Sequence, residues 1–89
     1  MGMKTIWLFN DGGMLKECTT FPYAYRYLWN VLRKAEEAGS QEINEMKKKF
    51  RITSPVGKVY DYDDATALAR RTGLLHTDGS LNSKEFRRQ

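Results

Sequence analysis

The first apolar run of the chain predicts a β-strand. Residues 6–9, IWLF, are continuously apolar, as in a strand that is covered on both faces or central in its sheet. The tetrapeptide NDGG at 10–13 supplies residues that tolerate positive φ, which tight hairpin turns require. Residues 15–19 then form a more polar strand, as expected nearer a sheet edge. The pattern therefore predicts a β-hairpin.

The stretch FPYAYRYLWN, residues 21–30, places aromatic rings at every second position, which is typical of a strand. The apolar residues that follow break this alternation. Four residues recur instead at helical spacing: Tyr25, Leu28, Leu32 and Ala35. Pro22 also favours a helix, because the missing N–H of proline would have no partner in a first helical turn. We therefore predict a helix near 22–38, with Tyr23 and Tyr27 displayed on its flank.

A second helix is predicted near 41–49. Gly39 is a suitable stop for the preceding helix, and Ser40 is a suitable N-cap for the new one. The new helix ends in the lysine run at 47–49, at the terminus where the helix dipole favours cations. The lysine run therefore has a structural explanation beside any role in binding.

The segment FRITSPVGKVYDY, residues 50–62, repeats the hairpin pattern around the turn SPVG. Asp63 or Asp64 is the expected N-cap of a third helix near 64–72, because aspartate caps helices well. A short closing helix is predicted near 82–88, where the spacing of Asn and Glu resembles a capping box.

These elements predict one α+β domain over residues 1–89, with two β-hairpins in a small, mostly antiparallel sheet packed against three to four helices. Both halves read strand, glycine turn, strand, helix, with Gly13 matching Gly57. This likeness is explained either by a ββα duplication or by the frequent reuse of this unit in small α+β domains. The length suffices for a core without metal or disulfide support, and the single cysteine, Cys18, is expected in that core. The chain shows no signal peptide and no run long enough to span a bilayer, so we predict a cytoplasmic protein.

Positive charge is concentrated in the second half of the chain. Residues 1–46 carry five basic and six acidic side chains, whereas residues 47–89 carry ten basic and five acidic ones. This asymmetry favours an acidic partner, of which nucleic acid is the commonest, although a solubilising surface has the same composition. The candidate phosphate contacts are Lys47, Lys48, Lys49, Arg51, Arg70, Arg71, Arg87 and Arg88.

Aromatic residues offer a second kind of contact. Tyr60 and Tyr62 are expected on one side of a strand, where exposed rings could stack on unpaired bases, unless the third helix covers them. The alternative function is a protein-interaction or oligomerisation module, in which Tyr23, Tyr27 and an exposed strand edge contact the partner. A small nucleic-acid-binding accessory protein is the leading hypothesis.

Residues suited to catalysis or metal binding are few. His76, the one histidine, lies in a polar loop far in sequence from Cys18, so the chain offers neither a zinc set nor an obvious nucleophile–base pair. The aspartates of DYDD, residues 61–64, lack the spacing of a calcium loop, and helix capping explains them. We predict no enzymatic activity, no cofactor and no metal site.

Residues 54–75, SPVGKVYDYDDATALARRTGLL, resemble the nuclease-associated modular DNA-binding repeats of homing endonucleases. The likeness is carried by Gly57, Val59, Tyr60, Ala65, Ala69, Gly73 and Leu74. In that family the pattern forms a small ββα or helix-turn-helix-like unit that accompanies a nuclease domain. This chain carries nothing that resembles a nuclease domain. The resemblance therefore implies at most a DNA-binding role for Arg70 and Arg71.

Overall fold

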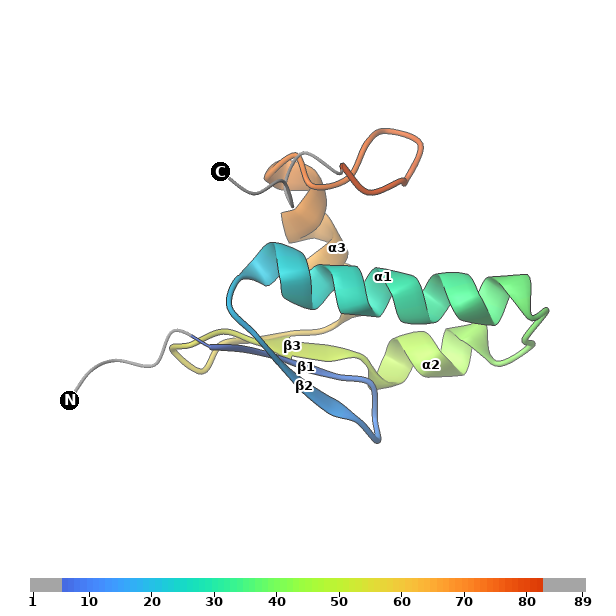
Figure 1. The fold of residues 1–89 in the computed structure, drawn as a ribbon, viewed down its shortest axis with the longest axis horizontal. Coiled ribbons are helices and arrows are strands. Elements are labelled where there is room, and N and C mark those ends of the chain that lie inside the picture. Colours follow the sequence, from blue (N-terminus) through green and yellow to red (C-terminus); the bar gives the residue numbers. More distant parts are fainter. Residues whose placement is uncertain (1–5, 83–89) are drawn as a thin grey trace.

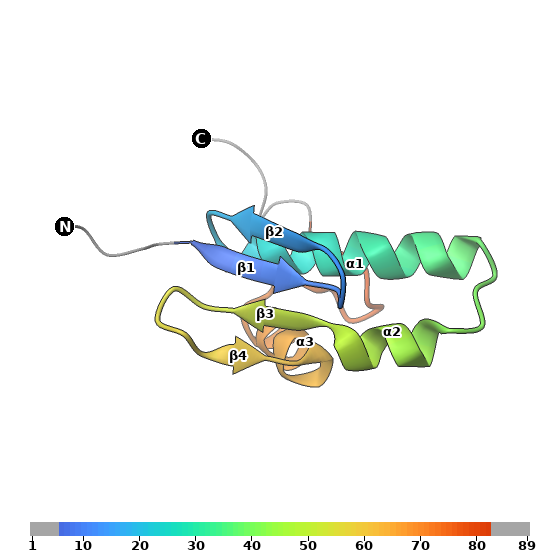
Figure 2. The same cartoon turned by 90° about the horizontal axis from the view of Figure 1, so that it is seen from below.

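The structure is a computed structural model that describes residues 6–82. Its strands are β1 (Trp7–Asn10), β2 (Leu15–Cys18), β3 (Arg51–Thr53) and β4 (Val59–Tyr60). Its helices are α1 (Phe21–Glu37), α2 (Ile43–Lys49) and α3 (Tyr62–Arg71). The strands form one antiparallel sheet of order β2-β1-β3-β4, as Figures 1 and 2 show. The predicted α+β class, with two hairpins in an antiparallel sheet, is confirmed.

The two hairpins meet at the centre of the sheet. Their first strands, β1 and β3, pair antiparallel, with Phe9 opposite Ile52. Two ββα units joined through their first strands would give this same strand order. The positive-φ glycines of the two turns are Gly12 and Gly57. The expected match of Gly13 with Gly57 is therefore wrong, and Gly12 is the counterpart of Gly57.

Helices α1 and α3 lie on one side of the sheet, as the view from below in Figure 2 shows, whereas α2 lies beside the sheet next to the end of β3. The side chains beneath them alternate with those on the other face, because successive strand residues point to opposite faces. Phe9 and Ile52 are fully buried on the helical side, and the Phe9 ring lies 5.6 Å from that of Phe50. Leu28 of α1 and Leu74 after α3 complete this core, both about 1% exposed. Burial of these large side chains supplies the driving force that holds the helices on the sheet.

Helix α1 forms as its apolar spacing predicts. Pro22 lies in its first turn, and Thr20 occupies the N-cap position. The stripe at helical spacing is buried: Tyr25, Leu28 and Leu32. The chain leaves the helix through Gly39, whose φ of +73° suits a residue without a Cβ.

The start of α2 differs from the prediction. Ser40 is not its N-cap, because α2 begins only at Ile43 and Glu42 occupies the cap position. The hydroxyl of Ser40 instead accepts a hydrogen bond from the backbone N–H of Glu42 at 3.1 Å. Serine side chains commonly form such local turns in place of a cap.

The start of α3 also differs. Asp61, rather than Asp63 or Asp64, is the N-cap, and its carboxylate accepts a hydrogen bond from the N–H of Asp64 at 2.8 Å. The preceding strand therefore ends at Tyr60, and Tyr62 belongs to the helix. The predicted helix near 82–88 lies, beyond its first residue, outside the described residues.

The sheet face away from the helices carries both aliphatic and polar side chains. Residues paired across the strands share a face, which places Leu8, Glu17, Thr53 and Val59 together on this open side. Val59 is 53% exposed. We call this surface the open sheet face.

Candidate functional site

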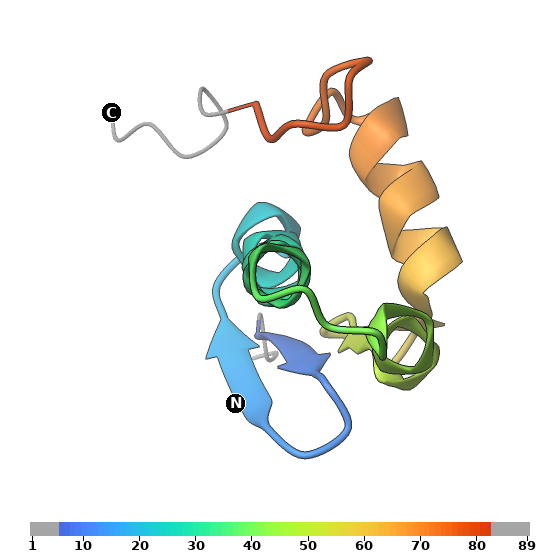
Figure 3. The same ribbon diagram turned by 90° about the vertical axis from the view of Figure 1, so that its right-hand side faces the viewer.

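A cleft of about 650 Å³ lies where the C-terminal turn of α2 meets the start of α3. It is lined by Asn44, Lys47, Lys48, Arg51, Asp61, Tyr62 and Asp63. Figure 3 shows why these residues meet: α3 begins beside α2 and then runs past α1, away from the sheet. Its volume falls within the range of about 300 to 1,000 Å³ that is typical of ligand sites. We call it the α2–α3 cleft.

The two lysines of the cleft have weak partners. The Lys47 ammonium lies 4.9 Å from the centre of the Tyr62 ring, which is a cation–π distance. The Lys48 ammonium lies 3.5 Å from the Glu45 carboxylate, and both side chains are more than 60% exposed. Exposed contacts of this kind contribute little stability, so either ammonium can turn to an incoming anion.

Arg51 is held more firmly than the lysines. One guanidinium nitrogen donates hydrogen bonds to the carbonyls of Lys48, at 2.8 Å, and Phe50, at 2.6 Å. These bonds satisfy carbonyls at the end of α2, where a helix leaves them without intrahelical partners. A guanidinium has five N–H donors, so Arg51 can fix the end of α2 and still bind an oxyanion.

A second cavity, of about 150 Å³, adjoins the cleft between α1 and α3. It is lined by Tyr25, Trp29, Leu32, Arg33, Glu36, Tyr62, Thr66, Arg70, Leu75 and Gly79. Tyr62 lines both spaces and therefore lies at their junction. Arg33 stacks on Trp29, with the guanidinium carbon 4.5 Å from the ring centre, and also forms an ion pair of 3.7 Å with Glu36. We call this space the α1–α3 cavity.

The walls of the α1–α3 cavity are tied together. The hydroxyls of Tyr25 on α1 and Thr66 on α3 are hydrogen-bonded at 3.1 Å. The Trp29 indole donates to the carbonyl of Gly79 at 3.2 Å, which joins α1 to the loop after α3. Burial raises the pKa of the Tyr25 phenol, and the bond to Thr66 partly opposes that shift. These contacts hold Trp29 and α3 in place before any ligand arrives.

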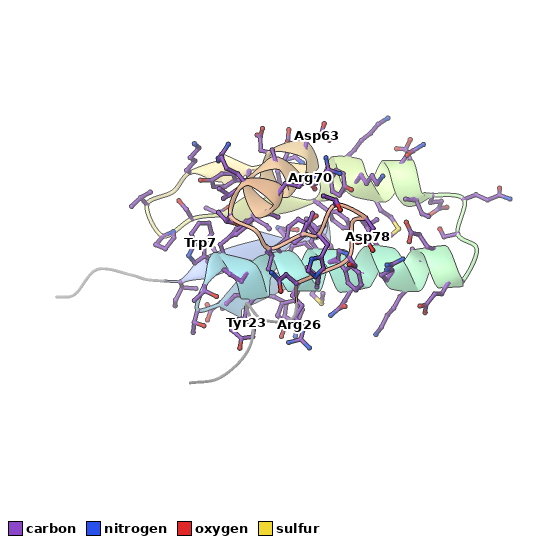
Figure 4. The ribbon with its side chains drawn as sticks, turned by 90° about the horizontal axis from the view of Figure 1, so that it is seen from above. Trp7, Tyr23, Arg26, Asp63, Arg70 and Asp78 are labelled. Carbon is purple, nitrogen blue, oxygen red and sulfur yellow. The ribbon has the colours of Figure 1, made fainter. Side chains whose placement is uncertain are left out.

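The structure brings together half of the predicted phosphate contacts. Lys47, Lys48 and Arg51 line the cleft, and Arg70, labelled on α3 in Figure 4, lines the adjoining cavity. The remaining predicted phosphate contacts that the structure describes line neither space. Lys49 packs its side-chain carbons against the β1–β2 turn at Gly12, Arg71 is exposed and lines neither space, and residues 87–88 lie outside the described part of the chain.

Sequence reasoning missed Trp29 and Arg33 as members of the site. Their spacing of four residues was a usable signal, because side chains at i and i+4 are neighbours on a helix. It missed Asp61 as well, which both caps α3 and lines the cleft.

The expectation that Tyr60 and Tyr62 share one side of a strand is wrong. Tyr60 lies on the helical side of the sheet, half-buried, with its ring 6.2 Å from that of Trp7 and 6.3 Å from that of Phe21. Lys58 places its ammonium 5.1 Å from the Tyr60 ring. Tyr60 is therefore part of the core margin, and Tyr62 alone reaches the cleft.

Tyr23 and Tyr27 belong to a different surface. Figure 4 shows Tyr23 and Arg26 on the side of α1 away from α3. With Tyr27 and Asn30 they line a cavity of about 340 Å³, and the Lys16 ammonium lies 5.6 Å from the centre of the Tyr27 ring. Tyr27 is exposed on this flank of α1, whereas Tyr23 is partly buried against the core, and neither extends the cleft.

Other reactive groups do not gather at the cleft. Cys18 is buried as expected, and burial raises the pKa of its thiol, with Lys16 opposing the shift. His76 lies exposed in the loop after α3. Within residues 6–82 no three histidine, cysteine or acidic side chains are placed to hold a metal ion together. Over the same residues, no helix combines the length and the apolar character needed to cross a membrane.

Comparisons with protein-family models, curated proteins and solved structures find no match for this chain. The resemblance of residues 54–75 to modular DNA-binding repeats therefore stays a prediction.

Proposed function

We propose that the protein binds nucleic acid in the α2–α3 cleft and the adjoining α1–α3 cavity. The observation that carries this proposal is that cations from separate elements line two adjoining spaces that share one aromatic ring, Tyr62. Lys47, Lys48 and Arg51 line the cleft, and the cavity adds Arg33 and Arg70. Cations beside an aromatic ring offer both contacts that an unpaired nucleotide needs, one for its phosphate and one for its base.

Carboxylates moderate this positive surface. Asp61 and Asp63 line the cleft, and Glu36 lines the cavity. Against five cations this leaves a small positive excess, so binding should be weak at physiological salt and should tighten as salt is lowered. If about four phosphates are neutralised, the logarithm of the association constant should fall with that of salt with a slope of about −3 for a single strand.

The test is a titration of labelled oligonucleotides, followed by fluorescence anisotropy at low and high salt. The double variant Lys47→Gln/Lys48→Gln removes two cleft cations, and we expect it to weaken binding and to flatten the salt slope. Its matched control is Lys34→Gln/Lys58→Gln, which removes the same charge outside both spaces. Absence of binding at low salt, or equal losses in the two variants, would contradict the proposal.

A second candidate function is protein interaction through the open sheet face. Three aliphatic side chains there are exposed: Ile6, Leu15 and Val59. A pocket of about 170 Å³ lies in the same surface, lined in part by Leu8 and Pro55. Exposed apolar side chains on one face are a feature of interaction sites, and here Leu15 and Val59 lie on the two edge strands of the sheet.

Self-association is the form of this second function that purified protein can test. Sedimentation velocity over a range of concentrations should show an oligomer if two open faces pack together. The variant Val59→Lys should then be monomeric, because it places a charge in the packed face. A wild-type protein that stays monomeric at every concentration would rule out self-association.

A further inference from the structure

We infer that the cleft takes single-stranded rather than duplex nucleic acid, with Tyr62 as the ring on which one base stacks. This inference rests on the proposed function and narrows the class of its ligand. It is drawn from the charge distribution along α3 and from the position of Tyr62 between the cleft and the cavity.

Helix α3 is charged in the wrong direction to read a duplex. Helices that enter the major groove contact base edges with residues of their N-terminal part. The N-terminal end of α3 instead carries Asp61, Asp63 and Asp64, whereas its basic residues, Arg70 and Arg71, lie in the last turn. If this end of α3 entered the major groove, its carboxylates would approach the phosphates of both strands. The first turn of α3 carries no basic residue that could offset this repulsion.

A single strand avoids this conflict because it exposes the edges of its bases. The amino groups of unpaired bases are hydrogen-bond donors, and aspartate or glutamate carboxylates accept from them. Asp61 and Asp63 lie in the same cleft as Lys47 and Lys48, so acceptors for base edges and cations for phosphates occur side by side. In a duplex, one hydrogen of each of these amino groups is used by the Watson–Crick pair, and the other can be reached only from within the major groove.

Tyr62 is placed where a base could stack. Its side chain is partly exposed and lines both the cleft and the cavity. The Lys47 ammonium, at 4.9 Å, now covers the ring. Stacking of a base on an aromatic ring is stronger than an exposed cation–π contact, so a base can displace the ammonium. The displaced Lys47 then remains near the ring to pair with the phosphate of the same nucleotide.

The α1–α3 cavity offers a second platform next to the first. The guanidinium of Arg33 lies over the Trp29 ring at 4.5 Å, and its side chain is 49% exposed. Unpaired bases stack on guanidinium planes as well as on rings. Tyr62 and Arg33 both line this cavity, so it offers a stacking surface to each of two bases of one strand.

The experiment compares a labelled single strand with a hairpin duplex that contains the same sequence, at one low salt concentration. We expect the single strand to bind at least about tenfold more tightly. Tyr62→Leu should weaken single-strand binding about tenfold without changing the salt slope, because it removes stacking but no charge. Tyr62→Phe keeps the ring and should bind like the wild type.

The outcomes separate this inference from the proposed function. If the duplex binds as tightly as the single strand, or if Tyr62→Leu has no effect while Lys47→Gln/Lys48→Gln weakens binding, the inference fails and the proposed function stands. If neither ligand binds at low salt, both fail.

Loss of the fold in Tyr62→Leu, detected by circular dichroism, would call for a second test on the wild-type protein. A single strand that contains 5-iodouracil forms photo-crosslinks to aromatic side chains on which it stacks. An adduct at Tyr62 would support the inference, and adducts confined to Tyr23 or Tyr27 would overturn it.

Discussion

The α2–α3 cleft and the open sheet face are parts of one small domain that differ in every property relevant to recognition. The cleft combines three cations, two carboxylates and one tyrosine ring, drawn from α2, β3 and the start of α3. The open sheet face mixes aliphatic and polar side chains, and two of the aliphatic ones, Leu15 and Val59, are each more than half exposed. A polyanion with flat bases fits the first surface, and an apolar protein surface fits the second.

A sheet that is covered by helices on one face only leaves two different surfaces available for function. Helices cover only one face of this sheet, so along each strand the side chains are alternately covered by helices and open to solvent (Figure 2). Ile52 is fully buried beneath the helices, whereas its neighbour Thr53 lies on the open side. The cleft is a separate surface, built by α2, Arg51 of β3 and the start of α3.

The largest expected effect is on the free energy of unfolding, and it differs between the two faces of the sheet. Ile52→Ala should lower the free energy of unfolding by about 2 to 5 kcal/mol, because it leaves a cavity in the core. Val59→Ala on the open face should change it by about 0.5 kcal/mol or less. Urea unfolding followed by circular dichroism measures both. A large loss from Val59→Ala would mean that the open face is packed in solution.

Charge reversal in the cleft is the next largest effect. Lys47→Glu/Lys48→Glu should weaken oligonucleotide binding by about tenfold or more at low salt, because phosphate contacts are replaced by repulsion. Leu15→Ser/Val59→Ser on the open face should leave the affinity within about twofold. Anisotropy titrations compare the two. The reverse pattern would move the nucleic-acid site to the sheet.

Substitution of Asp61 separates its two roles. Asp61→Ala removes the cap of α3 and should cost about 1 kcal/mol of stability. Asp61→Asn keeps a capping oxygen but removes a carboxylate from the cleft, so stability should hold within about 0.5 kcal/mol. Thermal unfolding checks stability. Titration with a single-stranded oligonucleotide should show weaker binding for Asp61→Asn, because the cleft loses a carboxylate that accepts hydrogen bonds from base amino groups. Equal or tighter binding by a stable Asp61→Asn would mean that this carboxylate makes no contact with the bases.

The smallest expected effect is a loss of stability at alkaline pH caused by Tyr25, in the wall of the α1–α3 cavity. This loss is absent at neutral pH. Burial raises its pKa in the folded state above the ordinary value of 10.0. As pH rises past that value the unfolded chain loses its proton first, so the unfolded state binds fewer protons and stability falls. Tyr25→Phe should lessen this alkaline loss, measured by urea unfolding between pH 8 and about pH 11. An identical alkaline slope in both proteins would assign the loss to other groups, of which Cys18, with its raised pKa, is the first to test.

Much of the fold could be predicted from local patterns. The helix at 21–37 and its buried stripe follow from apolar spacing of three and four residues, and Gly39 follows the end of α1 as expected. The start of α3 could not be predicted in the same way. Asp61, Asp63 and Asp64 are all good capping residues, and only the backbone geometry after the short strand β4 decides which of them caps.

The candidate site was predictable only in part. The lysines at 47–48 are adjacent in sequence, so their proximity needed no structure. Tyr62 and Arg33 lie far apart along the chain, and both line the cavity because α3 packs against α1 and begins beside α2. The spacing of apolar residues within a single helix or strand does not predict which residues of different elements come together.

The sequence by itself determined the α+β class, the two hairpins, the core face of α1 and the excess of positive charge in the second half. These follow from properties of near neighbours in the chain: hydrophobic period, turn residues and local composition. The tertiary structure alone decided which cations share a surface, that Tyr60 is covered while Tyr62 is displayed, and that one face of the sheet stays open. The physical reason is that burial and proximity between distant residues depend on how the helices pack on the sheet, and that packing is a property of the whole chain.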